Sequence, residues 1–419
     1  MGCGVAEVNG VMIQTIERGT SALMVAGALI MALSAPISLS LFALGSVLLI
    51  FGWLVSGKWG GKIESATSFA VTIPLVIFVA YAAATALYSD GEWSHTVRVL
   101  SSYLKLLLIP ILLSIAVQYN LGERLLTAFY ASCVLLLLLV WLDLVINIPW
   151  SQQSGVGVTA YHNIFMTYIS QGMALNACAV LAWYKGQTSG TERARYLHKM
   201  IVLLAFGAVF ALNGSRIGYI TGLGVAVLVA AGGWGERRAW RTTLALFLSL
   251  LIVLWFSPQF GDRVTQVIND LLAYSSPDTA VTSVGTRLGM VLYSLDLIFQ
   301  APIFGHGLGD YRTSALTFFS EGAALQISAI APTNQFLFIG VEMGIVGVAL
   351  FLWLLFMLLK PIFRATLEKK LLGVGLFWIF FVDSMGHHPI WDAGERQITL
   401  MLLIFICMVG SVTVSEQKN

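Results

Sequence analysis

Charged residues are scarce in this 419-residue chain, and their scarcity excludes most classes of protein. Asp, Glu, Lys and Arg make up 11% of the sequence, whereas hydrophobic residues make up 58% and the mean hydropathy is +0.85. Soluble globular domains carry about 25% charged residues. A soluble fold is therefore excluded, and we expect a polytopic membrane protein with no nucleic-acid partner.

Cysteine is also scarce. The four cysteines, Cys3, Cys133, Cys178 and Cys407, are scattered and mostly lie in apolar runs. This spacing predicts neither a disulfide framework nor a zinc site. Residues 1–19 lack the basic start and the small-residue cleavage site of a signal peptide, so we expect them to remain uncleaved.

Long apolar runs dominate the rest of the chain. A bilayer core of about 30 Å needs roughly 20 apolar residues per helix, and the sequence has about twelve such runs. They lie near 20–36, 39–56, 66–88, 98–117, 124–147, 163–184, 200–213, 217–233, 242–257, 334–359, 371–386 and 396–413. The predicted fold class is an all-α membrane protein with about 12 transmembrane helices.

The basic residues predict the orientation of these helices. If the N-terminus is cytoplasmic, sixteen of the twenty-three lysines and arginines fall in cytoplasmic segments, as the positive-inside rule requires. An even number of spans then places both termini in the cytoplasm. The chain is therefore expected to cross its membrane several times.

One external connection, Ser257 to Thr333, is far longer than the others. Its residues 285–299 place apolar side chains at spacings of three and four, which predicts an amphipathic helix with Arg287 at its N-terminal end. The apolar positions are Leu288, Val291, Leu292, Leu295 and Phe299. Pro302 and the glycines at 305, 307 and 309 predict a tight turn after it.

The predicted organisation has three parts. Residues 1–257 form transmembrane helices 1–9, and residues 334–419 form helices 10–12. Residues 258–333 form the external loop between helices 9 and 10, which is partly helical and contributes to the active site. Long loops of this kind usually carry function.

Cations at the external face need an explanation, because arginine near a bilayer is costly unless it snorkels, pairs or binds a ligand. Arg216 follows Asn-Gly-Ser at the start of a span, Arg287 starts the loop helix, and Arg98 starts the fourth span with Lys105 two turns later. The arginine fork matches phosphate oxygens, so these four residues are candidates for binding a lipid phosphate or pyrophosphate. Snorkelling, or pairing with nearby carboxylates, is the structural alternative.

Two motifs in and beside the loop carry a resemblance to a known family. The first motif consists of Thr286-Arg287, a helix, APIFGHGLGDY and then PTNQFLFIGVEMGIVG. It resembles the signature of the O-antigen ligase and polymerase-like family of bacterial envelope glycosyltransferases. NGSRIGY resembles the arginine-bearing segment of that family. Together the motifs cover Asn213 to Gly347, about a third of the chain.

The resemblance implies a metal-independent glycosyltransferase without a cofactor. Its active site is periplasmic, its donor is a glycan on undecaprenyl pyrophosphate, and its acceptor is lipid A–core oligosaccharide of lipopolysaccharide. Arg216 and Arg287 are expected to stabilise the departing pyrophosphate, with Arg98 and Lys105 as further donor-binding residues. The loop has no Asp-x-Asp pair or His/carboxylate cluster of metal-binding spacing.

The chain departs from the family at the start of the tenth span, where Thr333-Asn334 replaces His-Asn. Threonine is not a useful general base at neutral pH. One alternative is that Thr333 and Asn334 only orient the acceptor hydroxyl. The other is that a displaced histidine accepts the proton, and the external candidates are His162, His306, His387 and His388. His95, also external, is expected to be a solvated loop residue.

Other functions remain open from the sequence. A related O-antigen polymerase or protein O-oligosaccharyltransferase would differ only in its acceptor. A lipid-linked glycan flippase or other transporter, a different class, would also have about twelve spans. The few charged residues inside spans and the long external loop favour transfer at the membrane surface.

Overall fold

The computed structural model describes residues 2–57, 59–154, 161–233, 283–318 and 331–416, with four isolated positions between 265 and 272. The predicted ninth span, 242–257, and the loop up to residue 282 lie outside this part of the chain. The helices up to residue 154 are α1 (Gly2–Ser34), α2 (Leu39–Val55), α3 (Trp59–Thr67), α4 (Thr72–Thr85), α5 (Trp93–Leu104), α6 (Leu108–Gln118) and α7 (Gly122–Ile146).

The remaining elements include one small sheet. Strands β1 (Gln152–Ser154) and β2 (Tyr161–Asn163) pair antiparallel, so the all-α prediction misses a short hairpin. The later helices are α8 (Tyr168–Gln187), α9 (Glu192–Gly207), α10 (Arg216–Ala231), α13 (Ser283–Gln300), α14 (Asp310–Phe318), α16 (Gln335–Leu359), α17 (Leu367–Gly386) and α18 (Ala393–Glu416). Short helical turns η1 (Lys105–Leu107), η3 (Ala208–Leu212) and η4 (Ile362–Arg364) complete them.

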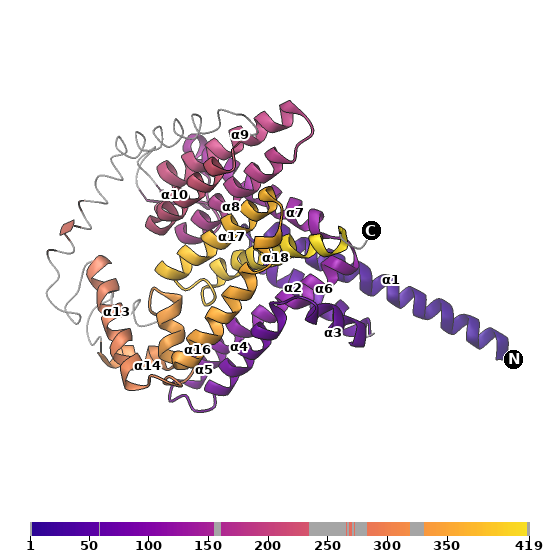
Figure 1. Ribbon diagram of the computed structural model, residues 1–419, viewed down its shortest axis with the longest axis horizontal. Coiled ribbons are helices and arrows are strands. Elements are labelled where there is room, and N and C mark those ends of the chain that lie inside the picture. Colours follow the sequence, from indigo (N-terminus) through magenta and orange to yellow (C-terminus); the bar gives the residue numbers. More distant parts are fainter. Residues whose placement is uncertain are drawn as a thin grey trace.

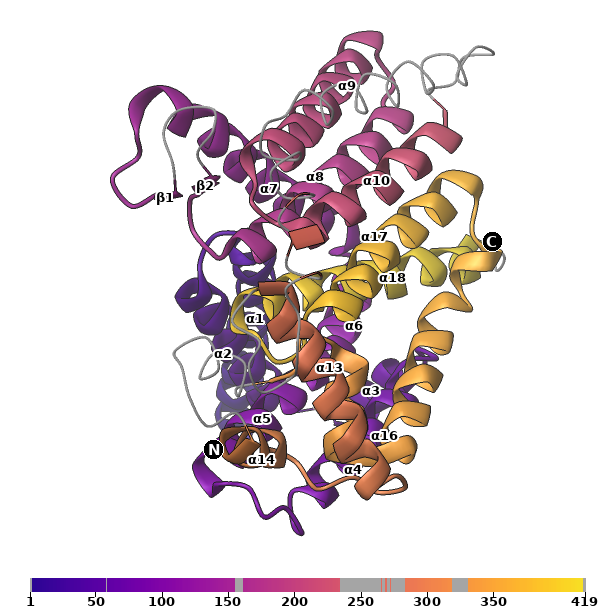
Figure 2. The ribbon, with the colours of Figure 1, turned by 90° about the vertical axis from the view of Figure 1, so that its left-hand side faces the viewer.

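The helices form two groups joined by a central pair. In Figures 1 and 2, α8, α9 and α10 lie at one end, α4, α5, α14 and α16 lie at the other, and α17 and α18 lie between them. Helix α8 is buried along almost its entire length. Hydrophobicity on all sides is typical of a helix inside a bundle, and α8 packs against α9, α10, α17 and α7.

Close backbone contact joins α1 to α2. A side chain at Gly27 would lie 2.7 Å from the Gly45 carbonyl oxygen, and one at Gly45 would lie 2.8 Å from the Gly27 carbonyl oxygen. Only glycine leaves room for this approach. Small residues at helix contacts are how membrane helices gain van der Waals packing when lipid offers no hydrophobic driving force.

The predicted count of about twelve spans is not confirmed. Within the described residues, four helices are long and apolar enough to cross a membrane: Trp93–Gln118, Gly122–Ile146, Glu192–Leu212 and Gln335–Arg364. Helices α3 and α4 meet at an angle of 100° and together form a fifth candidate. A multi-pass, mostly α-helical membrane protein is nevertheless supported.

Several predicted boundaries are wrong in detail. The third predicted span, 66–88, is the bent pair α3 and α4, whose break falls at residues 68–71. The fourth is interrupted by η1, where Lys105 lies. The sixth begins at Tyr168 rather than 163, because His162 and Asn163 pair in the hairpin.

The helix predicted over residues 285–299 is present as α13, and its apolar side chains do not all face the protein. Its buried side consists of Met290, Tyr293, Ser294 and Leu297. The predicted positions Leu292, Leu295 and Phe299 are exposed, Phe299 by 79%. An amphipathic helix beside a bilayer can place an apolar stripe in the lipid interface, so periodicity alone does not show which side faces the protein.

Candidate functional site

The turn after α13 docks onto a break in α16. Helix α16 has non-helical backbone at Gly344, with φ of 62° and ψ of −164°. The main-chain nitrogens of His306 and Gly307 donate to the carbonyls of Val341 and Glu342 at 2.9 and 3.0 Å. In return, the Ile345 nitrogen donates to the Pro302 carbonyl at 2.9 Å. Backbone groups freed by the break therefore find partners in the turn.

Glycine is required on both sides of this joint. Gly305, Gly307, Gly309 and Gly344 all have positive φ. A Cβ at Gly305 would lie 2.5 Å from the carbonyl carbon of Glu342, and one at Gly344 would lie 2.3 Å from the Ile303 oxygen. The glycine turn at residues 305–309 and the bend of α16 at Gly344 therefore pack directly against each other.

The Glu342 carboxyl group inside α16 has a hydrogen-bond partner in the glycine turn. Glu342 is fully buried, and its Oε1 accepts a hydrogen bond of 2.8 Å from the Gly309 nitrogen. The Tyr88 hydroxyl fixes the other side of the turn by donating to the Phe304 carbonyl at 2.6 Å. These contacts hold the end of α13 against the membrane helices.

Asn334 joins the start of α16 to the end of α17. Its Oδ1 accepts from the nitrogens of Phe336 and Leu337 at 2.9 and 3.0 Å, which caps the helix. Its Nδ2 donates to the Met385 carbonyl at 2.8 Å. The predicted acceptor-orienting side chain is therefore already committed to three backbone groups, and half-buried Thr333 lies directly before it.

The arginine motif also meets the end of α17. Ser215 caps α10 by accepting from the Gly218 nitrogen, and half-buried Arg216 is the first residue of that helix. A side chain at Gly386 would lie 2.8 Å from Ile217 Cδ1. The first turn of α10 thus packs against the residue that precedes His387.

His387 and His388 lie where these elements converge. The two rings stack with centroids 4.2 Å apart. His387 Nδ1 lies 2.6 Å from Glu395 Oε2, and 15% of its side chain is accessible. Burial lowers the pKa of His387 to about 4, Asp392 opposes that shift, and the Arg287 charge adds to it.

His388 is beside the threonine that replaces the family histidine. Burial lowers its pKa to about 3, the neighbouring His387 also lowers it, and Asp392 and a hydrogen bond to the Pro332 carbonyl raise it. Because Pro332 precedes Thr333, the imidazole pair occupies the neighbourhood of the missing histidine. The structure therefore brings Thr333, Asn334, His387 and His388 together, with the Arg287 charge acting on His387.

The loop that carries the histidines is firmly anchored. Arg396, which is 8% exposed, donates from Nη1 to the carbonyl of Trp391 at 2.8 Å and to Ser102 Oγ at 2.7 Å. His95 packs against Trp391 with centroids 5.9 Å apart and is 2% exposed, so the prediction of a solvated loop residue is wrong.

His162 belongs to a different network. Its Nδ1 lies 2.6 Å from Asp143 Oδ2, and Asp143 also accepts from the Ile148 nitrogen and Ser151 Oγ. His162 is 1% exposed and its carbonyl accepts from Gln171. These bonds tie the hairpin to α7 and α8, away from the contacts that surround His387.

The remaining predicted site residues are spread out. His306 has Nε2 2.9 Å from the Leu297 carbonyl, a bond that fixes the turn against α13. Arg98 is exposed on α5. Lys105 and Arg396 line a mainly apolar groove of about 530 Å³ between α2, the α5–α6 break and α18. Helix α5, which carries Arg98, lies at the opposite end of the molecule from α10, which Arg216 begins (Figures 1 and 2).

Sequence reasoning missed the carboxylates paired with histidine. Glu395 follows His387 by eight residues in HHPIWDAGER, and Asp143 precedes His162 by nineteen. A carboxylate shortly after a histidine pair was a usable signal for Glu395. The Asp143 partner depends on the hairpin, which the apolar pattern did not predict.

Comparison with known proteins agrees with the motifs. Residues 200–352 match the O-antigen ligase family model. An uncharacterized protein of Haemophilus influenzae is 32% identical over 161 residues, which cover 36% of this chain and 39% of that relative. The chain thus spans about two-fifths of that relative's length. The matched segment contains Arg216, Arg287, the glycine turn and the start of α16. That part of the chain is therefore similar to the O-antigen ligase family, which supports the resemblance seen in the sequence.

Proposed function

We propose that this protein is an O-antigen ligase, which transfers a glycan from undecaprenyl pyrophosphate to lipid A–core on the periplasmic face of the inner membrane. The family supports an enzyme of the O-antigen ligase or polymerase type. The observation that carries the proposal is the meeting of the histidine pair with residues 332–334, beside the Arg287 charge and the first turn of α10.

The arginines act on the leaving group. Arg216 begins α10, whose first turn packs against Gly386, and Arg287 lies near the start of α13, which packs against α16. As the bond from the anomeric carbon to the pyrophosphate breaks, its electron pair passes to the phosphate oxygen. Two guanidinium forks aimed at that charge stabilise the transition state more than the ground state.

His387 is the proposed proton acceptor. If Nδ1–H donates to Glu395, Nε2 has a free lone pair for the proton of the attacking acceptor hydroxyl. The acceptor oxygen bonds to the anomeric carbon as the pyrophosphate departs, so one bond forms and one breaks. The lowered pKa of His387 keeps the ring neutral at neutral pH.

Asn334 has a positioning role in this scheme. It fixes the spacing between α16 and α17 and thereby the position of Thr333 beside the histidines. Thr333 offers a hydroxyl that can hydrogen-bond the acceptor sugar. His162, in the buried Asp143 network, supports the hairpin and does not touch substrate.

The groove between α2, α6 and α18 is the proposed path of the donor lipid. It is lined mainly by apolar residues, with Lys105 and Arg396 as its cations. Arg396 also contacts the carbonyl of Trp391 in the histidine loop, so the groove adjoins the site. An isoprenoid chain fits such a lining. On this proposal both termini are cytoplasmic, about twelve helices span the membrane, and residues 258–333 form the periplasmic loop.

Purified full-length protein in proteoliposomes tests the proposal. The donor is an undecaprenyl-pyrophosphate glycan, and lipid A–core, a second lipid-linked glycan and an acceptor protein are offered separately, with and without chelator. We expect transfer to lipid A–core that chelator does not change. Movement of the donor across the bilayer without any glycosyl transfer would show a transporter, and transfer only to the second glycan would show a polymerase.

Arginine variants connect that activity to the site. Arg287→Ala should abolish transfer, and Arg287→Lys should restore little because it lacks the bidentate fork. Arg364→Ala is the matched control, since Arg364 is exposed in η4 on the predicted cytoplasmic side. Equal activity of the Arg287 and Arg364 variants would refute the role given to Arg287.

A further inference from the structure

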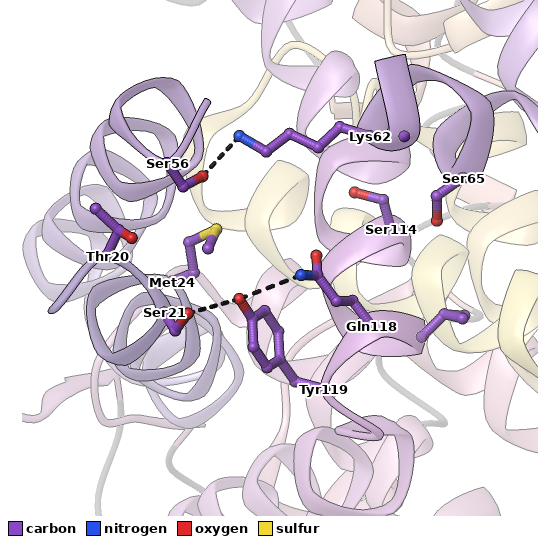
Figure 3. A pocket seen from close by; sticks show the side chains of 11 residues that line it. Thr20, Ser21, Met24, Ser56, Lys62, Ser65, Ser114, Gln118 and Tyr119 are labelled. Carbon is purple, nitrogen blue, oxygen red and sulfur yellow. Dashed lines mark hydrogen bonds between the residues drawn. The ribbon is translucent and has the colours of Figure 1, made fainter. Parts of the chain in front are cut away.

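A second cavity, with a polar lining, lies at the end of α4 that is opposite the glycine turn. Helix α4 starts beside α3 and ends just before Tyr88, which contacts the glycine turn. The cavity is at the α3 end, where residues 20–24 of α1, the end of α2 and the end of α6 meet α3. Its volume is about 540 Å³, and Figure 3 shows polar side chains from all four helices pointing into it.

Lys62 is the central cation of this cavity. It is 8% exposed, and its Nζ donates to Ser56 Oγ at 2.6 Å and to the Trp53 carbonyl. The ammonium also lies 5.1 Å from the ring centroids of Trp53 and Trp59. Figure 3 shows the lysine side chain extending across the cavity to Ser56.

No carboxylate contacts this ammonium among the side chains that the structure describes. The partners of Lys62 there are neutral oxygens and aromatic rings. A buried cation without a counter-charge is costly. An ammonium has three donors, and Lys62 gives two of them to Ser56 and Trp53. The third donor remains for an anion.

Hydroxyl groups line the rest of the cavity. Thr20 and Ser21 of α1, Ser65 of α3 and Ser114 of α6 contribute to its wall, and Ser21 Oγ lies 2.8 Å from the Tyr119 hydroxyl. Ser114 Oγ donates to the Ile111 carbonyl at 2.7 Å, whereas Ser65 and the Gln118 amide lie in the same wall as the ammonium. Together with Lys62, they suit the several oxygens of a phosphate group. A carboxylate would use fewer of these donors.

The position of the cavity selects the source of that phosphate. In the predicted orientation, the cytoplasmic side of the membrane is at residues 20–24 of α1, the end of α2 and the end of α6, which line this cavity. Trp59 and Ile63 of α3 are 44% and 55% exposed, as expected of a helix lying in the lipid interface. Cytoplasmic leaflets carry anionic lipids that attract basic residues. We propose that the cavity around Lys62 binds the phosphate of an anionic phospholipid headgroup from the cytoplasmic leaflet.

Binding to the full-length protein in detergent tests this site independently of glycan transfer. The probes are short-chain phosphatidylglycerol, phosphatidylcholine of equal chain length, and glycerol phosphate without a tail. We expect phosphatidylglycerol to bind most tightly, and Lys62→Gln to weaken it roughly tenfold or more, because a charge-assisted hydrogen bond is lost. Lys360→Gln, an equal charge change at an exposed lysine, should leave the affinity unchanged.

A second variant covers the case in which Lys62→Gln does not fold. Ser65→Phe keeps the ammonium and fills the cavity, so it should also abolish binding. Equal affinity for phosphatidylcholine and phosphatidylglycerol, or unchanged binding in the Ser65→Phe variant, would overturn the proposal. Tight binding of glycerol phosphate would support the phosphate site but assign it to a soluble ligand. If the wild-type protein binds phosphatidylglycerol but transfers no glycan, the result would contradict the proposed function and leave the lipid site supported.

Discussion

Replacing Gly305 by alanine should break the contact between the glycine turn and the bend of α16. Gly305 has φ of +74°, and left-handed backbone costs about 1–2 kcal/mol for a residue with a side chain. The new Cβ would also lie 2.5 Å from the Glu342 carbonyl carbon and 2.6 Å from the Gly344 nitrogen. Both are backbone atoms and cannot rotate away, so overpacking adds about 1–3 kcal/mol.

The free energy of unfolding should therefore fall by about 2–5 kcal/mol, measured by denaturant titration of the purified protein in detergent. Gly190→Ala is the matched control, because a Cβ there meets nothing within 4 Å and its φ is not positive. The two variants should differ clearly. If Gly305→Ala unfolds at the same denaturant concentration as Gly190→Ala, the turn is not locked to α16 as described.

Three further predictions concern the end of α17. Asn334→Ala should lower the unfolding free energy by about 1–2 kcal/mol, because a cap and a tether are lost, whereas Asn334→Asp should restore the cap alone; equal stability of both variants would contradict this. Thr333→His should keep or raise the transfer rate, and a complete loss would show that the hydroxyl is essential. His387 has a folded-state pKa of about 4 against an ordinary 6.5, so the unfolded chain binds more protons between these values. Its contribution to stability should therefore be complete above about pH 6.5 and decline as the pH falls towards 4. A His387→Gln variant should show a smaller slope over this range, with the remainder due to His388, whose pKa is also lowered.

Much of the fold could be predicted because the signals are local. Apolar runs and turn residues located most helices, and the glycines after α13 correctly indicated a tight turn. Periodicity could not identify the buried face of α13, since lipid and protein both accept apolar side chains. The bend at residues 68–71 was also hidden, because α3 and α4 share one nearly continuous apolar run.

The candidate site shows the same division. Arg216 and Arg287 were recognisable from their motifs, whereas the proximity of His388 to Thr333 depends on packing between α16 and α17. Two histidine–carboxylate pairs have the same distance, 2.6 Å, in different surroundings. Only their burial and neighbours distinguish the pair at His162, to which we assign a structural role, from the pair at His387.

The most direct test of the proposed site compares these two pairs. Initial rates of glycan transfer to lipid A–core would be measured in proteoliposomes for His387→Gln and His162→Gln, at equal amounts of folded protein. We predict that His387→Gln loses nearly all activity, while His162→Gln keeps the rate of the folded wild-type protein and loses only stability. Wild-type activity in His387→Gln, with activity lost in His162→Gln, would contradict the assignment of the proton acceptor.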